Sequence, residues 1–132
     1  MSIDKIFDHW QKSYKNSWET AKILYKNKRY SDCLFYCHLS LEKLLKAIYV
    51  LKNKKHSPFI HDLLMLAQKS DVNLTKEQIK NLESITIFNI AGRYAEIKSQ
   101  FYQSCNNKAT ADKYFKITEN LIKCLKKFLI KK

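Results

Sequence analysis

The stretch from Tyr36 to Leu66 decides how this chain folds. It reads YCHLSLEKLLKAIYVL over residues 36–51, then passes through a short lysine-rich break, and continues as IHDLLML over residues 60–66. The first part repeats its apolar residues three or four positions apart, which is typical of a helix with an apolar inner face. Pro58 disfavours helix at the residue before it, so the break separates two helices. The stretch therefore predicts two helices joined by a connector.

Helical spacing of apolar residues continues on both sides of this stretch. It predicts a first helix over about residues 2–26, a second over 31–52, a third over 61–68, a fourth from Thr75 and a last one from Thr110. With one Gly and one Pro in 132 residues, tight β-turns have few places to form. The expected fold is all-α: a four- to five-helix up-and-down bundle that makes a single domain over residues 1–132.

Polar residues at the predicted helix ends indicate how the helices begin and stop. Ser31 and Thr110 are expected to cap the second and the last helix, because their hydroxyl groups can accept hydrogen bonds from the first backbone N–H groups. Thr75 and Gln78 have the spacing of a capping box. Gly92 is expected to end or kink the fourth helix.

The chain is strongly basic. Its 25 Lys and Arg residues face 12 Asp and Glu residues, which gives a formal charge of +13, and the excess is spread along both halves of the sequence. Such a field favours an anionic partner, namely RNA, the phosphates of a nucleotide or an acidic protein. The alternative is a solvated, lysine-rich surface with no specific partner.

The cysteines indicate the compartment in which the protein works, and the apolar runs indicate whether it crosses a membrane. Cys33, Cys37, Cys105 and Cys124 have neither the spacing of a metal site nor that of a disulfide framework, so free thiols in a reducing cytoplasm are expected. No uncharged apolar run approaches the roughly 20 residues that cross a membrane. The sequence predicts a cytoplasmic protein with no cofactor, no metal and no membrane partner.

Arg93 is the first candidate site residue. The chain has 23 Lys but only two Arg, and Arg93 follows the only Gly. A guanidinium group binds phosphate through two parallel hydrogen bonds, which an ammonium group cannot do. Tyr94, the next residue, can stack on a base. The alternative is that Arg93 pairs with Glu42 or Glu96 inside the bundle and that Tyr94 belongs to the core.

A polar ladder on the second helix is the next candidate. His38, Glu42 and Lys46 lie four residues apart on one helix face. In an otherwise apolar helix they need partners, and an internal network that fixes the helix register supplies them. The alternative assigns Lys43 and Lys46 to phosphate contacts at a groove.

His61 and Asp62 open the predicted third helix. Asp62 can cap that helix or complement its dipole, which explains the residue without any function. His61 is a neighbour of the cap, a surface group or a ligand contact near the mouth of the bundle.

The segment Cys37–Ala47, the step His61-Asp62-Leu63 and Gly92-Arg93-Tyr94, taken in this order, resemble the HEPN domain family over about residues 8–130. The resemblance implies a helical bundle like the substrate-binding subunits of nucleotidyltransferases. Such bundles form homodimers and often partner a separately encoded minimal nucleotidyltransferase in toxin–antitoxin or defence systems. It also implies that the two Arg93 residues of a dimer lie near a shared cleft.

The ribonucleases of this family carry an Arg followed, after four to six residues, by a His. Arg93 resembles that Arg, but YAEIKSQ follows it and no His occurs after His61. Lys98 can stabilise charge, yet it is a poor general base at neutral pH. We therefore expect a non-catalytic module that binds nucleotide or RNA phosphates. The alternatives are a metal-independent ribonuclease toxin with a degenerate motif and a purely structural dimeric scaffold.

Overall fold

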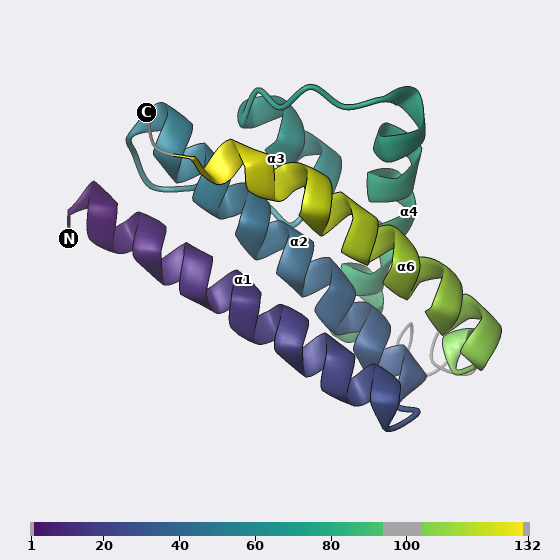
Figure 1. The fold of residues 1–132 in the computed structure, drawn as a ribbon. Helices are drawn as coiled ribbons and strands as arrows, with labels where there is room; N and C mark the ends of the chain where they lie inside the picture. Colours follow the sequence, from purple (N-terminus) through teal and green to yellow (C-terminus); the bar gives the residue numbers. More distant parts are fainter. Residues whose placement is uncertain (1, 94–103, 131–132) are drawn as a thin grey trace.

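The protein is an all-α bundle. The computed structural model describes residues 2–93 and 104–130, with the side chains of residues 89–93 outside the description. Within these residues there is no β-strand, and the predicted four- to five-helix bundle is confirmed (Figure 1). The helices are α1 (Ile3–Lys26), α2 (Tyr30–Asn53), α3 (Leu63–Lys69), α4 (Lys76–Arg93), α6 (Lys108–Leu125) and the 3-10 helix η1 (Lys126–Leu129).

Helices α1 and α2 form an antiparallel hairpin, as Figure 1 shows. The predicted first helix is confirmed, and the hydroxyl oxygen of Ser2 caps it by accepting a hydrogen bond from the N–H of Lys5. The turn after α1 is a Schellman motif: the N–H of Lys28 donates to the carbonyl of Tyr25, and the N–H of Arg29 donates to the carbonyl of Leu24. Lys28 takes the left-handed conformation, with φ of 62°.

The second helix begins earlier than predicted. Its first residue is Tyr30, and Arg29 occupies the cap position without a side-chain capping bond. The predicted cap at Ser31 is wrong, because the Schellman turn returns the chain to helical geometry one residue before Ser31. Ser31 is buried in the first turn instead.

The third helix begins later than predicted. It starts at Leu63, and Asp62 is its N-cap, with the carboxylate accepting a hydrogen bond of 3.1 Å from the N–H of Met65. An N-cap residue has a non-helical backbone, so His61 stays in the connector between α2 and α3. The N–H of Leu63 donates to the hydroxyl of Thr86, which ties the start of α3 to α4.

Helix α4 begins with the predicted capping box. The N–H of Thr75 donates to the side-chain oxygen of Gln78 at 2.9 Å, and the N–H of Gln78 donates to the hydroxyl of Thr75 at 3.1 Å. Gly92 lies one residue before Arg93, where the described part of the helix ends. A single Gly lowers helix stability by only about 1 kcal/mol relative to Ala, so a helix can include one Gly and remain stable.

The cap of α6 is Asn107, and the prediction of Thr110 is wrong. Asn107 has an extended backbone, and its side-chain oxygen accepts a hydrogen bond of 2.8 Å from the N–H of Thr110. Thr110 is therefore the third residue of the helix rather than the residue that precedes it.

A polar contact joins α6 to α1. The hydroxyl of Tyr25 donates a hydrogen bond to the carboxylate of Asp112, and the ammonium of Lys108 lies 2.9 Å from the same carboxylate. These two donors lower the pKa of Asp112, and the hydrogen bond from Tyr25 is the larger cause. Tyr25 also stacks on Phe115, so an aromatic contact supports the polar one.

Helix α2 is the centre of the bundle, since it contacts α1, α3, α4, α6 and η1. Because α2 is covered on most sides, any polar side chain on it needs a partner within the protein. Apolar spacing predicts seven residues for its inner face: Leu51 is only half-buried, and the other six are buried, namely Leu34, Cys37, Leu41, Leu44, Leu45 and Ile48.

The four cysteines form no disulfide bond in the structure; Cys33, Cys37 and Cys105 are buried, and Cys124 is half-buried. A hydrogen bond with Cys33, together with burial, holds the pKa of the Cys37 thiol well above its usual range. In the part of the chain that the structure describes, no helix is both long enough and apolar enough to cross a membrane.

Candidate functional site

A buried carboxylate lies on the central helix. Glu42 is only 4% exposed, and three basic side chains approach it. Lys46 Nζ lies 3.1 Å from its Oε2, His61 Nδ1 lies 3.0 Å from its Oε1, and His38 Nδ1 lies 3.9 Å from the same oxygen. We call these four residues the Glu42 cluster.

The sequence builds the cluster from two places. His38, Glu42 and Lys46 share one face of α2 because they are spaced by four residues. His61 arrives from the connector and is fixed twice, since its carbonyl oxygen also lies 2.9 Å from His38 Nε2. The cluster therefore holds the connector against α2.

The hydrogen bonds indicate where the ring protons sit. A carbonyl oxygen can only accept, so Nε2 of His38 carries the proton that it donates to His61. A carboxylate also accepts, so Nδ1 of His61 carries the proton that it donates to Glu42. Both imidazole rings are thus oriented by partners inside the protein.

The ammonium group of Lys46 has two partners in the structure, Glu42 and Trp10. Its side chain is about 6% exposed, its ammonium pairs with Glu42, and the same ammonium lies 5.1 Å from the centre of the Trp10 ring. A cation over an aromatic face gains stabilisation that grows as water is excluded. A phosphate that bound Lys46 would have to compete with both contacts.

Lys43 points to a different neighbour. Its ammonium donates a hydrogen bond of 2.9 Å to the hydroxyl of Ser17 on α1. Burial lowers the pKa of Lys43, and the negative charge of Glu42 opposes that shift. Lys43 is half-buried, so its charge can still act on a ligand at the surface between α1 and α2.

The other sequence-predicted residues lie elsewhere. Asp62 caps α3 through its bond to Met65 and is not a member of the Glu42 cluster. Arg93 is the last described residue of α4, and its side chain lies outside the described part, as do Tyr94 and Lys98. Among the side chains that the structure describes, the partners of Glu42 are the two histidines and Lys46, while the predicted pairing of Glu42 with Arg93 falls outside the described residues.

Sequence reasoning misses three relationships around this site. The helical spacing places Trp10 on the inner face of α1, but it does not reveal the contact with Lys46. Nothing in the pattern links Ser17 to Lys43, which lies 26 residues away. The pattern assigns His61 to a helix end, and only the cap at Asp62 signals that it stays in the connector.

The cluster is suited to holding charge rather than metal. Its members present one carboxylate to three nitrogen bases, and the described residues contain no group of three His, Cys, Asp or Glu side chains able to hold a metal ion. The arrangement can fix the helix register and hold His61 against α2.

The fold and this cluster together define a class: small helical bundles in which a central helix carries buried ionic groups. The chain belongs to the HEPN domain family, whose sequence pattern it matches over residues 8–128.

A solved structure supports the same fold. The crystal structure of TT1696 from Thermus thermophilus is similar, with a TM-score of 0.77. The match covers 93% of this chain and 98% of that one at 14% sequence identity, so the likeness concerns the fold alone. No curated protein matches the sequence.

Proposed function

We propose that this protein is a binding module without catalytic activity that engages the phosphates of nucleotides or RNA. Membership of the HEPN family supports a nucleotide- or RNA-related role in general. The observation that carries the proposal is the Glu42 cluster: both central histidines are already oriented by Glu42 and by the backbone. His38 is also fully buried, so its imidazole is out of reach of a bound RNA.

The proposed phosphate contacts come from the end of α4 and from α2. Arg93 grips a phosphate through two hydrogen bonds, and Tyr94 stacks on the attached base. Additional positive charge comes from Lys98, Lys43, Lys46 and His61. Among these, Lys43 is the best placed on α2, because Lys46 is buried against Glu42 and Trp10.

A thermal-melting experiment tests this proposal. ATP or a short single-stranded RNA should raise the melting temperature by mass action, and added salt should reduce the increase. Arg93→Lys should lose most of the increase because an ammonium group cannot form the bidentate contact, whereas Lys132→Ala should lose little. Equal losses in the two variants would mean that only diffuse charge is recognised.

We further propose that the protein forms a homodimer and partners a separately encoded nucleotidyltransferase, in a system of the toxin–antitoxin or defence type. The dimer would use α2 and α4 and bring the two Arg93 residues to one cleft.

Light scattering at tens of micromolar should report twice the mass of the chain. A monomer at that concentration would contradict the dimer, and co-purification from the native host tests the enzyme partner.

A second candidate function is a metal-independent ribonuclease with a degenerate motif. One observation favours it: Glu42 Oε1 lies 3.0 Å from His61 Nδ1, and 41% of the His61 side chain is exposed. A carboxylate that fixes one imidazole nitrogen sets the tautomer of the ring, as in many acid–base pairs. This candidate requires RNA cleavage that depends on both Arg93 and His61.

A further inference from the structure

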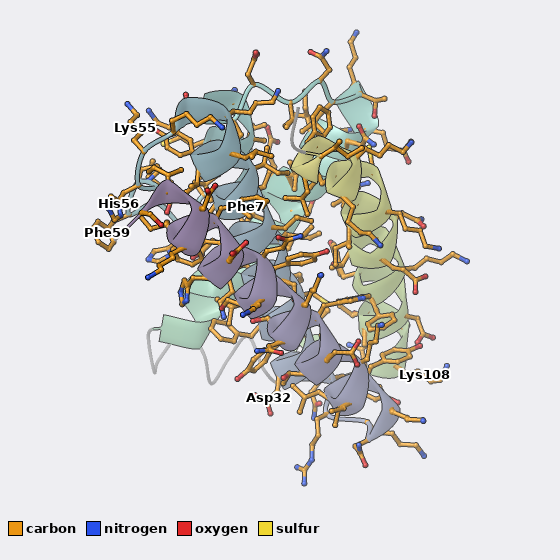
Figure 2. The ribbon with its side chains drawn as sticks, turned by 60° about the vertical axis from the view of Figure 1, so that its left-hand side comes forward. Phe7, Asp32, Lys55, His56, Phe59 and Lys108 are labelled. Carbon is orange, nitrogen blue, oxygen red and sulfur yellow. The ribbon has the colours of Figure 1, made fainter. Side chains whose placement is uncertain are left out.

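Phe59 is an unusual surface residue. It lies in the connector between α2 and α3 and is fully exposed, although a phenyl ring is among the side chains that folded proteins most often bury. Figure 2 shows Phe59 on one edge of the molecule, close to His56 and on the same side as Lys55.

The display of Phe59 is fixed by its neighbours. The N–H of Ile60 donates to the carbonyl of Pro58 at 2.9 Å, which makes a tight turn centred on Phe59. Ile60 then packs against the core, and His61 is bound to both Glu42 and His38. Because the residues that follow it are anchored, Phe59 is held outward by the fold rather than by a fraying chain end.

A pocket opens beside this ring. It has a volume of about 220 Å³ and is lined by residues of the connector and by two residues from the long helices. That volume is below the roughly 300–1,000 Å³ of pockets that enclose drug-sized ligands, so it suits one flat ring better than a whole nucleotide. The lining residues are Trp10, Lys46, His56, Ser57, Pro58 and Phe59.

The surroundings are basic. Lys54, Lys55 and His56 are exposed, and the sequence contains no acidic residue from Lys52 to His61. Two other acidic residues lie close by: Asp62 follows His61 and caps α3, and Asp4 lines another pocket together with Lys54. The nearby carboxylate of Glu42 is already paired with Lys46 and His61. An anionic chain that follows the connector would therefore meet positive charge next to an exposed aromatic ring.

We propose that the connector from Lys54 to Ile60 binds single-stranded nucleic acid. One unpaired base stacks on Phe59 at the mouth of the pocket, while Lys54, Lys55 and His56 contact the phosphates on either side. Aromatic rings interleaved with basic side chains are the usual means of holding an unpaired strand, because every base has a face for stacking. A duplex hides those faces, so the site selects single strands.

This inference rests on the proposed function and narrows it to a strand longer than one nucleotide. An apolar groove of a protein partner is the competing occupant of Phe59. The charge favours nucleic acid, since Lys54, Lys55 and His56 precede Phe59 on the connector and His56 also lines the pocket.

Fluorescence anisotropy with a labelled single-stranded RNA of about twelve nucleotides tests the site in the full chain. Phe59→Ala should weaken binding by about five- to a hundredfold, the range expected for the loss of one base–aromatic stack. Ile23→Ala is the matched control, because Ile23 is another exposed apolar residue and lies near the far end of α1. The duplex of the same sequence should bind more weakly than the single strand to the wild type and should not respond to Phe59→Ala.

Two further variants give independent readouts. Phe59→Trp should retain binding, and the fluorescence of the new indole should be quenched by the stacked base. Lys55→Ala should reduce the slope of log affinity against log salt by about 0.7, the value for one phosphate contact on a single strand.

The outcomes separate this inference from the proposal on which it rests. Unchanged RNA affinity in Phe59→Ala, together with weaker binding in Arg93→Lys, would overturn the role of the connector and leave the binding module intact. A wild type that binds neither ATP nor RNA would overturn both. Unchanged RNA affinity with a smaller mass in light scattering would identify Phe59 as a contact between protein chains and would overturn the inference.

Discussion

His61 Nδ1 lies 3.0 Å from Glu42 Oε1, although the two residues are separated by the second half of α2 and the whole connector. This bond ties the end of the connector to the central helix. It also places an imidazole between a buried carboxylate and the exposed residues of the connector.

The Glu42 cluster should contribute strongly to stability. Glu42→Gln leaves the buried ammonium of Lys46 without its counter-charge, and breaking a buried ion pair in this way typically costs about 3–5 kcal/mol. The double variant Glu42→Gln/Lys46→Met should recover much of that loss, because the buried charge is then gone. Urea unfolding measures both values, and Glu19→Gln, which affects an exposed pair, is the control. A double variant as unstable as the sum of the two single changes would contradict the coupling.

The cap of α6 can be tested with two alanine substitutions. Asn107→Ala should lower the free energy of unfolding by about 1 kcal/mol, because the N–H of Thr110 loses its partner. Thr110→Ala should cost less, since it leaves that hydrogen bond in place. Thermal or urea unfolding decides between them, and the reverse order would show that Thr110 is the cap.

The lowered pKa of Asp112 predicts a specific response to acid. A carboxylate whose pKa is lower in the folded state stabilises the fold above its ordinary pKa of about 3.9, and the contribution disappears as the pH falls through the folded value. The melting temperatures of the wild type and Asp112→Asn should therefore differ at pH 6 and converge below pH 4. Tyr25→Phe removes the main cause of the shift and should move the convergence toward higher pH. A difference that stays constant down to pH 2.5 would contradict this assignment.

The purified protein should not cleave single-stranded RNA above background. A general acid–base group of suitable pKa typically contributes about 10²–10⁴-fold to a rate, and the sequence supplies no His after Arg93. Gel analysis of a labelled RNA measures cleavage directly. Activity lost in both Arg93→Ala and His61→Ala would support the ribonuclease, with Glu42→Gln expected to shift its pH profile. Activity that is indifferent to these changes would point to a contaminant.

The sequence predicts the parts of this fold that depend on local patterns. Apolar spacing locates α1 and the inner face of α2, and the pair Thr75 and Gln78 locates the start of α4, because these signals lie within one or two helical turns. The predictions of Ser31 and Thr110 as caps are wrong for a shared reason. The position of an N-cap depends on the residue at which the preceding turn brings the backbone into helical geometry. A hydroxyl-bearing residue near the start of a helix does not reveal which residue that is.

The site is less accessible to prediction from the sequence than the fold. The pairs of Glu42 with His38 and Lys46 follow from spacing on one helix. The contacts to His61, Trp10 and Ser17 join separate elements, so they depend on how the helices pack. The exposure of Phe59 also cannot be predicted from the sequence, because an isolated apolar residue after Pro58 can be either buried or exposed.

The central position of α2 has a consequence for the order in which the chain folds. The α1–α2 hairpin joins neighbouring segments, so it can form with little loss of chain entropy, whereas α6 must close a loop of more than fifty residues to reach α2. We expect Leu41→Ala, on α2, to slow folding and Leu121→Ala, on α6, to accelerate unfolding instead, as stopped-flow kinetics would measure. Helix α2 is then the template on which the later helices assemble.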